Sequence, residues 1–246
     1  MHNLRVLIAA AGRGSRAGLP YPKTLYPVDG VPILLRLTSL LTPYDPLPTI
    51  IVSPSGESPI RDCLIEASLN AHLVIQPQPL GMGDAVLRFI ESPAFKDSEH
   101  ILLVWGDIPF IQPATIAGLI SAHFKNHNDF TFVTRLVDSA YTVVSRDLNG
   151  NVSGVVETRE LGNIQPQPGE RDIGLFIFRK NLTLSALDKE LSGKRGQTTG
   201  EHGFLYVIEH LVKMGLRVEA LPIACELDLI SLNKIEDLAA NPEMKY

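Results

Sequence analysis

Apolar runs separated by turn-forming residues divide the first half of the chain into alternating strands and helices. Leu4–Ala11 is a continuous apolar run that ends at a glycine, which is typical of a strand buried on both faces of a parallel sheet. Shorter apolar runs predict strands at 49–53, 72–76 and 101–105, and helical patterns or helix-start signals occupy 31–42, 59–69, 83–91 and 113–127. The alternation predicts an α/β fold in which a mostly parallel, mixed sheet is sandwiched by helices.

The second half of the chain has shorter strand-like segments and fewer helices. The pattern predicts strands at 130–136, 141–146, 152–158, 171–178 and 217–222, and helices at 182–191, 204–214 and 235–240. Asn149-Gly150 is a strong hairpin signal between two of these strands. The segment 162–171, rich in Gly, Pro and Gln, predicts a loop.

Composition excludes several classes of protein. The chain has 246 residues, 45% of them hydrophobic, which is the composition of a globular protein. Its net charge of −5 argues against general binding of nucleic acid or anionic membrane. Its two cysteines, Cys63 and Cys225, are too few for a disulfide scaffold. No segment has the pattern of a secretory signal or a bilayer span, and the expected location is the cytoplasm.

A loop of glycines and basic residues follows the first strand. Ala9–Arg16 reads AAAGRGSR, and Lys23 adds a cation a few residues later. Glycines allow a backbone to approach a ligand closely and turn its N–H groups inward, while arginine and lysine neutralise phosphate charge. We therefore expect Ala10, Ala11, Gly12 and Gly14 to bind a polyphosphate together with the nearby cations.

Two other interpretations of this loop remain open. Gly12, Gly14 and Ala17 also fit a dinucleotide-binding fingerprint, with Asp29 as the ribose carboxylate, although the prolines that follow oppose the helix which that motif needs. Titration with NADH would test for such an oxidoreductase. The segment could also be a solvated basic turn. A Walker loop is excluded, because no Gly-Lys-Ser/Thr follows at the required spacing.

Four blocks, in order along the chain, resemble those of sugar-phosphate nucleotidyltransferases. They are similar in particular to the uridylyltransferase domain of bifunctional N-acetylglucosamine-1-phosphate uridyltransferases. The blocks are residues 10–16 with Pro22-Lys23, QPQPLGMGDA at 76–85, LVWGDIP at 103–109 and LNKIEDL at 232–238. The resemblance implies a Rossmann-like nucleotide-diphospho-sugar transferase fold. It further implies a single domain, 1–246, whose residues 1–128 bind nucleotide and whose residues 129–246 bind sugar phosphate.

The resemblance also implies a reaction in which a sugar 1-phosphate attacks the α-phosphorus of a nucleoside triphosphate and releases pyrophosphate. Arg16 and Lys23 match the residues that hold the triphosphate, and Asp107 and Asn233 match the oxygen ligands of Mg²⁺. Alternatives remain for the last two, since Asp107 could be a turn residue and Asn233 a helix N-cap with Glu236.

Residues that would recognise the substrates depart from the family pattern in places. Gln76 and Gly81 match base contacts, while Met82 stands where the uridylyl enzymes usually have threonine, so UTP is favoured without being fixed. On the sugar side, the candidate residues are Tyr141, Glu157 and Asp172. Their surroundings differ from those of the uridyltransferases, which leaves the sugar open. The chain has no hexapeptide repeats, so acetyltransferase activity is not expected.

Other functions and sites fit the sequence less well. Glycosyltransferases of the same fold usually carry an Asp-x-Asp motif, which Asp107-Ile108-Pro109 lacks. Cytidylyltransferases of the isoprenoid pathway share the first block, but the other blocks fit them less well. A non-catalytic nucleotide sensor would keep the pocket without turnover. His123 and His127 lie four apart on a predicted helix, and we interpret them as a solvated helix face. Trp105 and the apolar residues of 204–211 are expected in the core.

Overall fold

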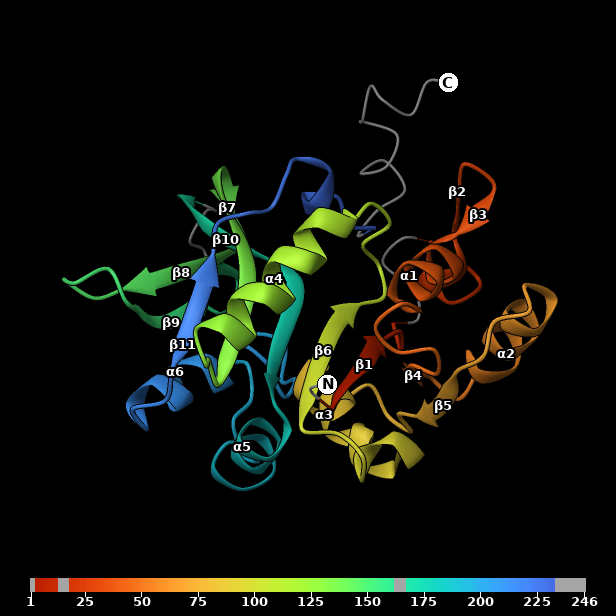
Figure 1. The fold of residues 1–246 in the computed structure, drawn as a ribbon, viewed down its shortest axis with the longest axis horizontal. Coiled ribbons are helices and arrows are strands. Elements are labelled where there is room, and N and C mark those ends of the chain that lie inside the picture. Colours follow the sequence, from red (N-terminus) through yellow and green to blue (C-terminus); the bar gives the residue numbers. More distant parts are fainter. Residues whose placement is uncertain (1–2, 13–17, 162–166, 233–246) are drawn as a thin grey trace.

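The computed structural model describes residues 3–12, 18–161 and 167–232 (Figure 1). Seven strands of this part form one sheet in the order β11-β7-β10-β6-β1-β4-β5. Their bounds are Leu4–Ala9 (β1), Thr49–Val52 (β4), His72–Ile75 (β5), His100–Trp105 (β6), Phe130–Ala140 (β7), Gln167–Arg179 (β10) and Val218–Leu221 (β11). Four of the six pairings are parallel, and β10 pairs antiparallel with both β6 and β7. The predicted mostly parallel, mixed sheet is confirmed.

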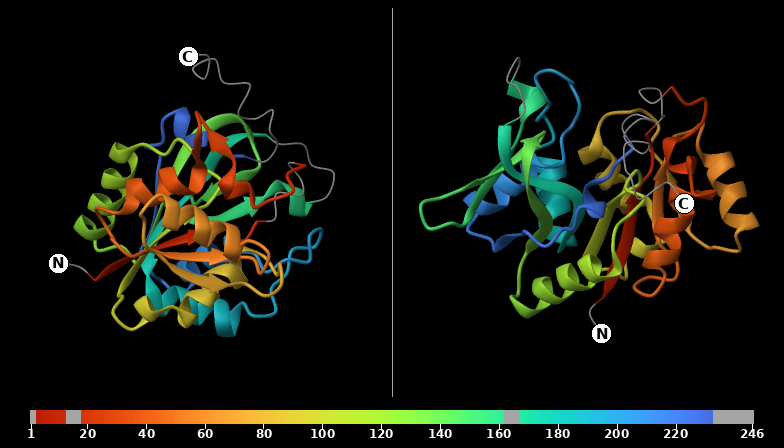
Figure 2. Two further views of the ribbon diagram at one scale, coloured as in Figure 1. Left: turned by 90° about the vertical axis from the view of Figure 1, so that its right-hand side faces the viewer. Right: turned by 90° about the horizontal axis from the view of Figure 1, so that it is seen from above.

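Helices cover both faces of this sheet (Figures 1 and 2). The α-helices are Ile33–Leu41 (α1), Glu57–Glu66 (α2), Met82–Leu87 (α3), Pro113–Lys125 (α4), Lys180–Ser185 (α5) and Tyr206–Lys213 (α6). Short helical turns lie at Lys23–Leu25 (η2), Arg88–Glu91 (η3), Pro93–Phe95 (η4), Thr158–Leu161 (η5), Ala186–Glu190 (η6) and Leu227–Leu229 (η7). No helix among the described residues is long and apolar enough to cross a lipid bilayer.

The apolar residues of the central strands contribute to two hydrophobic clusters, one on each face of the sheet. Along β1, Val6 and Ile8 pack into the cluster that includes α1, α2 and α4, while Leu7 between them packs into the cluster on the other face. This second cluster contains the buried residues of α6 and six buried phenylalanines: Phe89, Phe130, Phe132, Phe176, Phe178 and Phe204. Successive side chains of a strand point to opposite faces, so a strand covered on both sides must be apolar throughout. The expected core positions of 204–211 are all buried.

Two small hairpins stand apart from the main sheet. Pro27–Val28 (β2) pairs with Val31–Pro32 (β3), so the helix predicted from Val31 begins instead at Ile33. Thr142–Arg146 (β8) pairs antiparallel with Val152–Glu157 (β9) and projects from the end of the sheet that carries β11 (Figure 1). Gly150 has a φ of 83° in the turn between them, which confirms the predicted hairpin.

The pairing of β7 with β10 extends further than the sequence pattern indicates. The predicted strand ends at 136, yet β7 continues to Ala140, and β10 begins at Gln167 within the predicted loop. The two extensions pair with each other, with Glu170 opposite Leu136 and Gln167 opposite Ala140. Each extension supplies hydrogen-bond partners for the backbone N–H and C=O groups of the other. The strands therefore continue through residues whose polar side chains face solvent. The predicted helix at 235–240 lies outside the described residues.

Candidate active site

A cavity of about 120 Å³ opens where β1 and β6 end. The two strands are parallel, with Ala9 opposite Trp105, so their carboxyl ends meet at one edge of the sheet. Open parallel sheets bind ligands at this edge. The lining residues come from three of the four blocks found in the sequence and from two residues that flank the first block, Ala9 and Thr24. From the blocks themselves they are Ala10, Gly12, Lys23, Met82, Trp105, Gly106 and Asp107.

Small residues allow the backbone segments at this edge to approach one another. A Cβ on Gly106 would lie 2.8 Å from the carbonyl oxygen of Ala9, and a Cβ on Gly12 would lie 3.0 Å from Cε of Lys23. The glycines therefore keep the cavity open and make room for the lysine side chain. Of the residues predicted to bind the triphosphate, Ala10, Gly12 and Lys23 line the cavity, whereas Ala11, between Ala10 and Gly12 in the chain, is not among the lining residues. Gly14 and Arg16 lie outside the described residues.

Lys23 and Asp107 form an ion pair inside the cavity. Lys23 begins η2 directly after Pro22, and Asp107 follows the end of β6, so two segments far apart in the sequence meet here. Lys23 Nζ also lies 3.4 Å from the carbonyl oxygen of Leu232. The side chains are 25% and 14% exposed respectively, which leaves both charged groups within reach of a ligand in the cavity.

The second carboxylate oxygen of Asp107, Oδ1, is buried and has no hydrogen-bond partner among the described residues. An unpaired anionic oxygen is costly to bury, and a hard cation such as Mg²⁺ would satisfy it. The backbone N–H of Leu232 donates to the carbonyl oxygen of Asp107 at 2.8 Å, so the chain enters the 233–246 segment from this edge. Asn233 itself is outside the described residues. The described part of the chain has no cluster of three or more His, Cys, Asp or Glu side chains suited to a metal. A cation held by Asp107 would therefore need further oxygen ligands from elsewhere.

The loop after β5 is built around Gln76. The Gln76 side chain is almost buried, and its Nε2 donates to the carbonyl oxygen of Gly81 at 3.0 Å and to Oδ2 of Asp84 at 2.9 Å. Asp84 in turn accepts a hydrogen bond from Arg88 at 2.9 Å. The predicted base-recognition residues Gln76, Gly81 and Met82 are thus brought together, with Met82 reaching the cavity.

His202, which the sequence analysis did not single out, holds this loop from the other side. The backbone N–H of His202 donates to the carbonyl oxygen of Leu80 at 2.6 Å, and the backbone carbonyl oxygen of His202 accepts from the N–H of Gly83 at 2.8 Å. Gly81 has a φ of 109°, and a Cβ there would lie 2.6 Å from the carbonyl oxygen of His202. The His202 side chain is buried, and burial, together with the charge of Arg195, lowers its pKa. The sequence signal that could have indicated this contact is the pair of glycines in the QPQPLGMG block, Gly81 and Gly83. Each lies where the backbone of the His202 segment leaves little room for a Cβ.

Trp105 packs against the core, as expected, but it also borders the cavity. It lines the cavity, contacts both core clusters, and buries its Nε1 without a hydrogen-bond partner among the described residues. Its indole ring lies against Gly174, where a Cβ would come within 2.6 Å of the ring. Gly174 has a φ of 78° and sits in an irregular stretch of the β10 pairing, between Asp172 and Phe176. The bulge therefore makes room for the indole beside the cavity.

The three residues predicted to bind the sugar, Tyr141, Glu157 and Asp172, are all neighbours of Thr142 in the chain, in the sheet or through a hydrogen bond. Thr142 pairs with Glu157 across the β8–β9 hairpin and donates a hydrogen bond of 2.5 Å to Oδ1 of Asp172. Tyr141 precedes it and is 62% exposed. Asp172 is buried, its other oxygen accepts from the N–H of Gly174 at 3.1 Å, and burial raises its pKa. Asp172 is therefore committed to contacts within the protein, whereas Tyr141 has a surface that a ligand can reach.

His123 is buried, contrary to the expected solvated helix face. Its ring nitrogens lie 2.9 Å from Nδ1 of His100 and 2.9 Å from Oγ1 of Thr131. A separate cavity of about 200 Å³ lies beside this pair, lined also by Phe124, His127, Asn128 and Arg179. His100 begins β6 and Asp107 follows its end, so this histidine pair belongs to the opposite edge of the sheet. His127 is exposed, as expected.

Comparisons with known proteins agree with this arrangement. Residues 6–168 match the family described as the MobA-like NTP transferase domain. The bifunctional protein GlmU of Alkalilimnicola ehrlichii is 30% identical over 240 residues, covering 96% of this chain and 50% of that protein. The GlmU of Coxiella burnetii is 32% identical over 174 residues, covering 70% of this chain and 37% of that protein. The chain thus spans about half the length, or less, of these curated relatives.

Solved structures share the fold at low sequence identity. A Bacillus anthracis protein described as a candidate glucose-1-phosphate thymidylyltransferase, in complex with sucrose, superposes with a TM-score of 0.77 at 15% identity. The superposition covers 96% of this chain and 93% of that one. HddC from Yersinia pseudotuberculosis, in complex with GMP-PN, gives a TM-score of 0.69 at 19% identity and covers 99% of each chain.

The family match covers more than half of the chain and includes the loop after β1, the loop after β5 and the end of β6, which together form the cavity. The chain belongs to the MobA-like NTP transferase domain family.

Proposed function

We propose that the protein transfers a nucleoside monophosphate from a nucleoside triphosphate to a sugar 1-phosphate, forming an NDP-sugar and releasing pyrophosphate. The observation that carries the proposal is the cavity at the ends of β1 and β6, where Gly12, Lys23 and Asp107 converge. Membership of an NTP transferase family and the similarity to GlmU proteins support the same reaction.

The reaction needs positioned charges more than it needs a strong base. The attacking phosphate of a sugar 1-phosphate is already anionic at neutral pH, so catalysis consists of alignment and neutralisation of charge. Lys23 is suited to this task because its ammonium group lies in the cavity beside small residues that leave space for phosphates. Arg16 is proposed to act on the same phosphates, with backbone groups of Ala10, Ala11, Gly12 and Gly14 around them.

Asp107 is proposed to bind Mg²⁺ through its buried Oδ1, with Asn233 as a second oxygen ligand. The ion, when bound, would neutralise charge on the phosphates. In the free protein, Lys23 balances the charge of Asp107. A bound triphosphate offers Lys23 a second anionic partner, so the lysine can exchange the carboxylate for a phosphate oxygen without moving far.

The sugar phosphate is proposed to bind near β8, β9 and β10, which carry or adjoin the candidate sugar-binding residues. Tyr141 and Glu157 would contact the sugar, while Asp172 fixes Thr142 and the turn at Gly174 from behind. This assigns nucleotide binding to residues 1–128 and sugar-phosphate binding to residues 129–246 of a single domain. UTP is the favoured nucleotide, with Gln76, Gly81 and Met82 around the base.

Product identification tests the proposal. The protein is incubated with Mg²⁺, each of ATP, CTP, GTP, UTP and dTTP, and a panel of hexose and N-acetylhexosamine 1-phosphates, and the products are analysed by mass spectrometry. An NDP-sugar formed in one combination supports the proposal. Binding of a nucleotide with no product in any combination would instead favour a nucleotide-sensing protein.

A further inference from the structure

We propose that Asp84 is a positioning residue that fixes the amide of Gln76 in one orientation, and that it thereby restricts the nucleotide to a base with a ring N–H donor. Such bases are uracil, thymine and guanine. The proposal rests on the proposed function only in taking Gln76 as a contact of the base. The other steps follow from the hydrogen bonds around Gln76.

Both amide hydrogens of Gln76 are already used within the protein. Nε2 donates to the carbonyl oxygen of Gly81 at 3.0 Å and to Oδ2 of Asp84 at 2.9 Å. A carbonyl and an ionised carboxylate can only accept hydrogen bonds, so the NH₂ end of the amide must face them. The reverse orientation would place Oε1 against two acceptors in an almost buried site, which is unfavourable.

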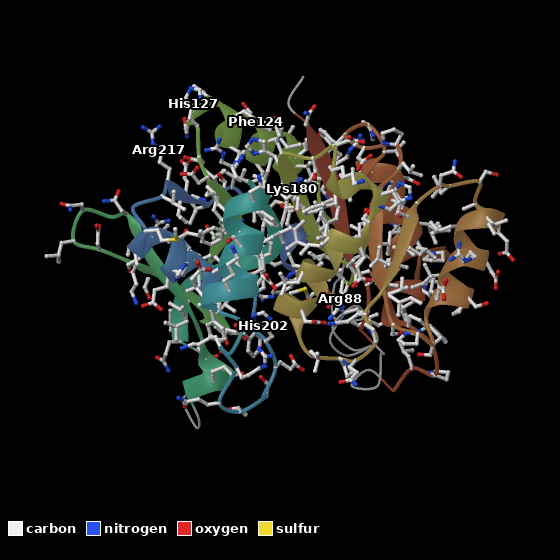
Figure 3. All side chains as sticks on the ribbon, turned by 90° about the horizontal axis from the view of Figure 1, so that it is seen from below. Arg88, Phe124, His127, Lys180, His202 and Arg217 are labelled. Atoms are coloured by element: carbon white, nitrogen blue, oxygen red, sulfur yellow. The ribbon has the colours of Figure 1, made fainter. Side chains whose placement is uncertain are left out.

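Arg88 supports the acceptor role of Asp84 by pairing with its carboxylate. Its guanidinium donates to Oδ1 of Asp84 at 2.9 Å, and a second nitrogen donates to Glu91 at 2.9 Å. The hydrogen bond with Asp84, followed by that with Glu91, raises the pKa of Arg88 above its ordinary value. Figure 3 shows Arg88 on the same side of the molecule as His202, whose segment holds the loop in place.

Within the side chain of Gln76, the polar atom left for a ligand is Oε1, which is an acceptor. No described residue donates a hydrogen bond to Oε1. Oε1 is also not one of the fully buried polar atoms that lack a partner, so a ligand can reach it. A base that turns an N–H toward it gains a hydrogen bond, as N3–H of uracil or thymine and N1–H of guanine do. Cytosine N3 and adenine N1 would place a lone pair there, and the mismatch leaves both acceptors unpaired.

The test compares nucleotide binding by the wild type, Asp84→Asn and Glu91→Gln. Dissociation constants for Mg-UTP and Mg-CTP are measured by calorimetry, and thermal unfolding shows that each variant is folded. Glu91→Gln is the matched control, since it removes the other carboxylate bound to Arg88 without touching Gln76. In Asp84→Asn, the new amide can donate to Gln76 and allow its amide to turn.

The wild type is expected to bind UTP at least about 10-fold more tightly than CTP, which corresponds to about 1.4 kcal/mol. Asp84→Asn should reduce this ratio toward one, and Glu91→Gln should leave it unchanged. A merely structural role of Asp84 would weaken both nucleotides equally. A folded Asp84→Asn variant with the wild-type ratio would overturn the inference, as would a wild type that prefers CTP or ATP.

The outcomes separate this inference from the proposed function. If no nucleotide binds to the wild type, both fail. If nucleotides bind and Asp84→Asn changes the ratio while no pyrophosphate is released with any sugar phosphate, the inference stands and the proposed activity fails. If Asp84→Asn does not fold, the wild-type order of the five nucleotides still decides, because UTP, dTTP or GTP must exceed both CTP and ATP.

Discussion

The ammonium group of Lys23 and the carboxylate of Asp107 form an ion pair in the cavity at the end of β6, although 84 positions separate them in the chain. Each group is mostly shielded from solvent, and the two opposite charges border a cavity of about 120 Å³. The pair places a phosphate-binding cation next to an oxygen suited to a metal. This is the arrangement that nucleotidyl transfer requires.

Replacing Lys23 with alanine should lower the turnover rate by roughly 10²–10³, the scale of losing one preorganised group that stabilises transition-state charge. Initial rates of pyrophosphate release measure the effect. Lys213→Ala is the matched control, because Lys213 forms an exposed ion pair with Glu209 and neither residue lines the cavity. Equal rates for the two variants would remove Lys23 from the catalytic machinery.

Gly174→Ala should destabilise the protein more than Gly150→Ala. Both glycines have φ near 80°, so each substitution carries a backbone cost of about 1–2 kcal/mol. A Cβ at Gly174 would also lie 2.6 Å from the Trp105 ring, whereas nothing lies within 4 Å of one at Gly150. This overpacking should add about 1–3 kcal/mol, measured as the free energy of unfolding in urea. Similar losses for both variants would show that the indole is free to move away.

His123→Ala should lower the free energy of unfolding by about 2–3 kcal/mol, because it removes a buried side chain and leaves Thr131 and His100 without that partner. The turnover rate should be unchanged, since the pair lies at the opposite edge of the sheet. His127→Asn is the surface control, as asparagine also tolerates the positive φ of 52° at that position. A loss of activity in folded His123→Ala would point to a link between the two edges.

Glu170 should make stability depend on pH in the acidic range. Burial alone would raise the pKa of Glu170, but hydrogen bonds from Arg146 and Thr134 hold it below its ordinary value of 4.5. An acid with a lowered folded-state pKa stabilises the protein above the unfolded-state value, and this contribution is lost as the pH falls through the folded-state value. Unfolding in urea should therefore show a decline below about pH 4.5 that is smaller in Glu170→Gln. Glu57→Gln, in an exposed pair with Arg61, should follow the wild type, and a Glu170→Gln curve that also does so would contradict the assignment.

The site could be predicted from the sequence where the chemistry is local to one strand end. The apolar runs that form β1 and β6 each end in residues of recognisable type, and parallel pairing brings Gly12 and Asp107 to one edge. The approach of Lys23 to Asp107 depends on tertiary contacts, although Lys23 was expected to hold the triphosphate and Asp107 to bind the Mg²⁺ that accompanies it.

Residues whose role arises from packing between distant segments could not be predicted in this way. His202 acts through its backbone, and no motif marks the segment that carries it. Trp105 ends an apolar run, and periodicity does not reveal that the bulge at Gly174 turns its ring toward the cavity. His123 was misinterpreted because spacing on a helix does not show whether a polar partner such as His100 lies on the neighbouring strand.

Pyrophosphate release is the most direct measurement of the central claim, namely that the cavity beside Lys23 and Asp107 holds a triphosphate for transfer to a sugar 1-phosphate. The rate is followed with the nucleotide and sugar phosphate identified by product analysis, over a range of Mg²⁺ concentrations, for the wild type and Asp107→Asn. The account predicts release that requires the sugar phosphate, stops with a chelator, and in Asp107→Asn needs at least about 10-fold more Mg²⁺ for half-maximal rate. Release that proceeds equally without a sugar phosphate, or that is unaltered by Asp107→Asn, would contradict it.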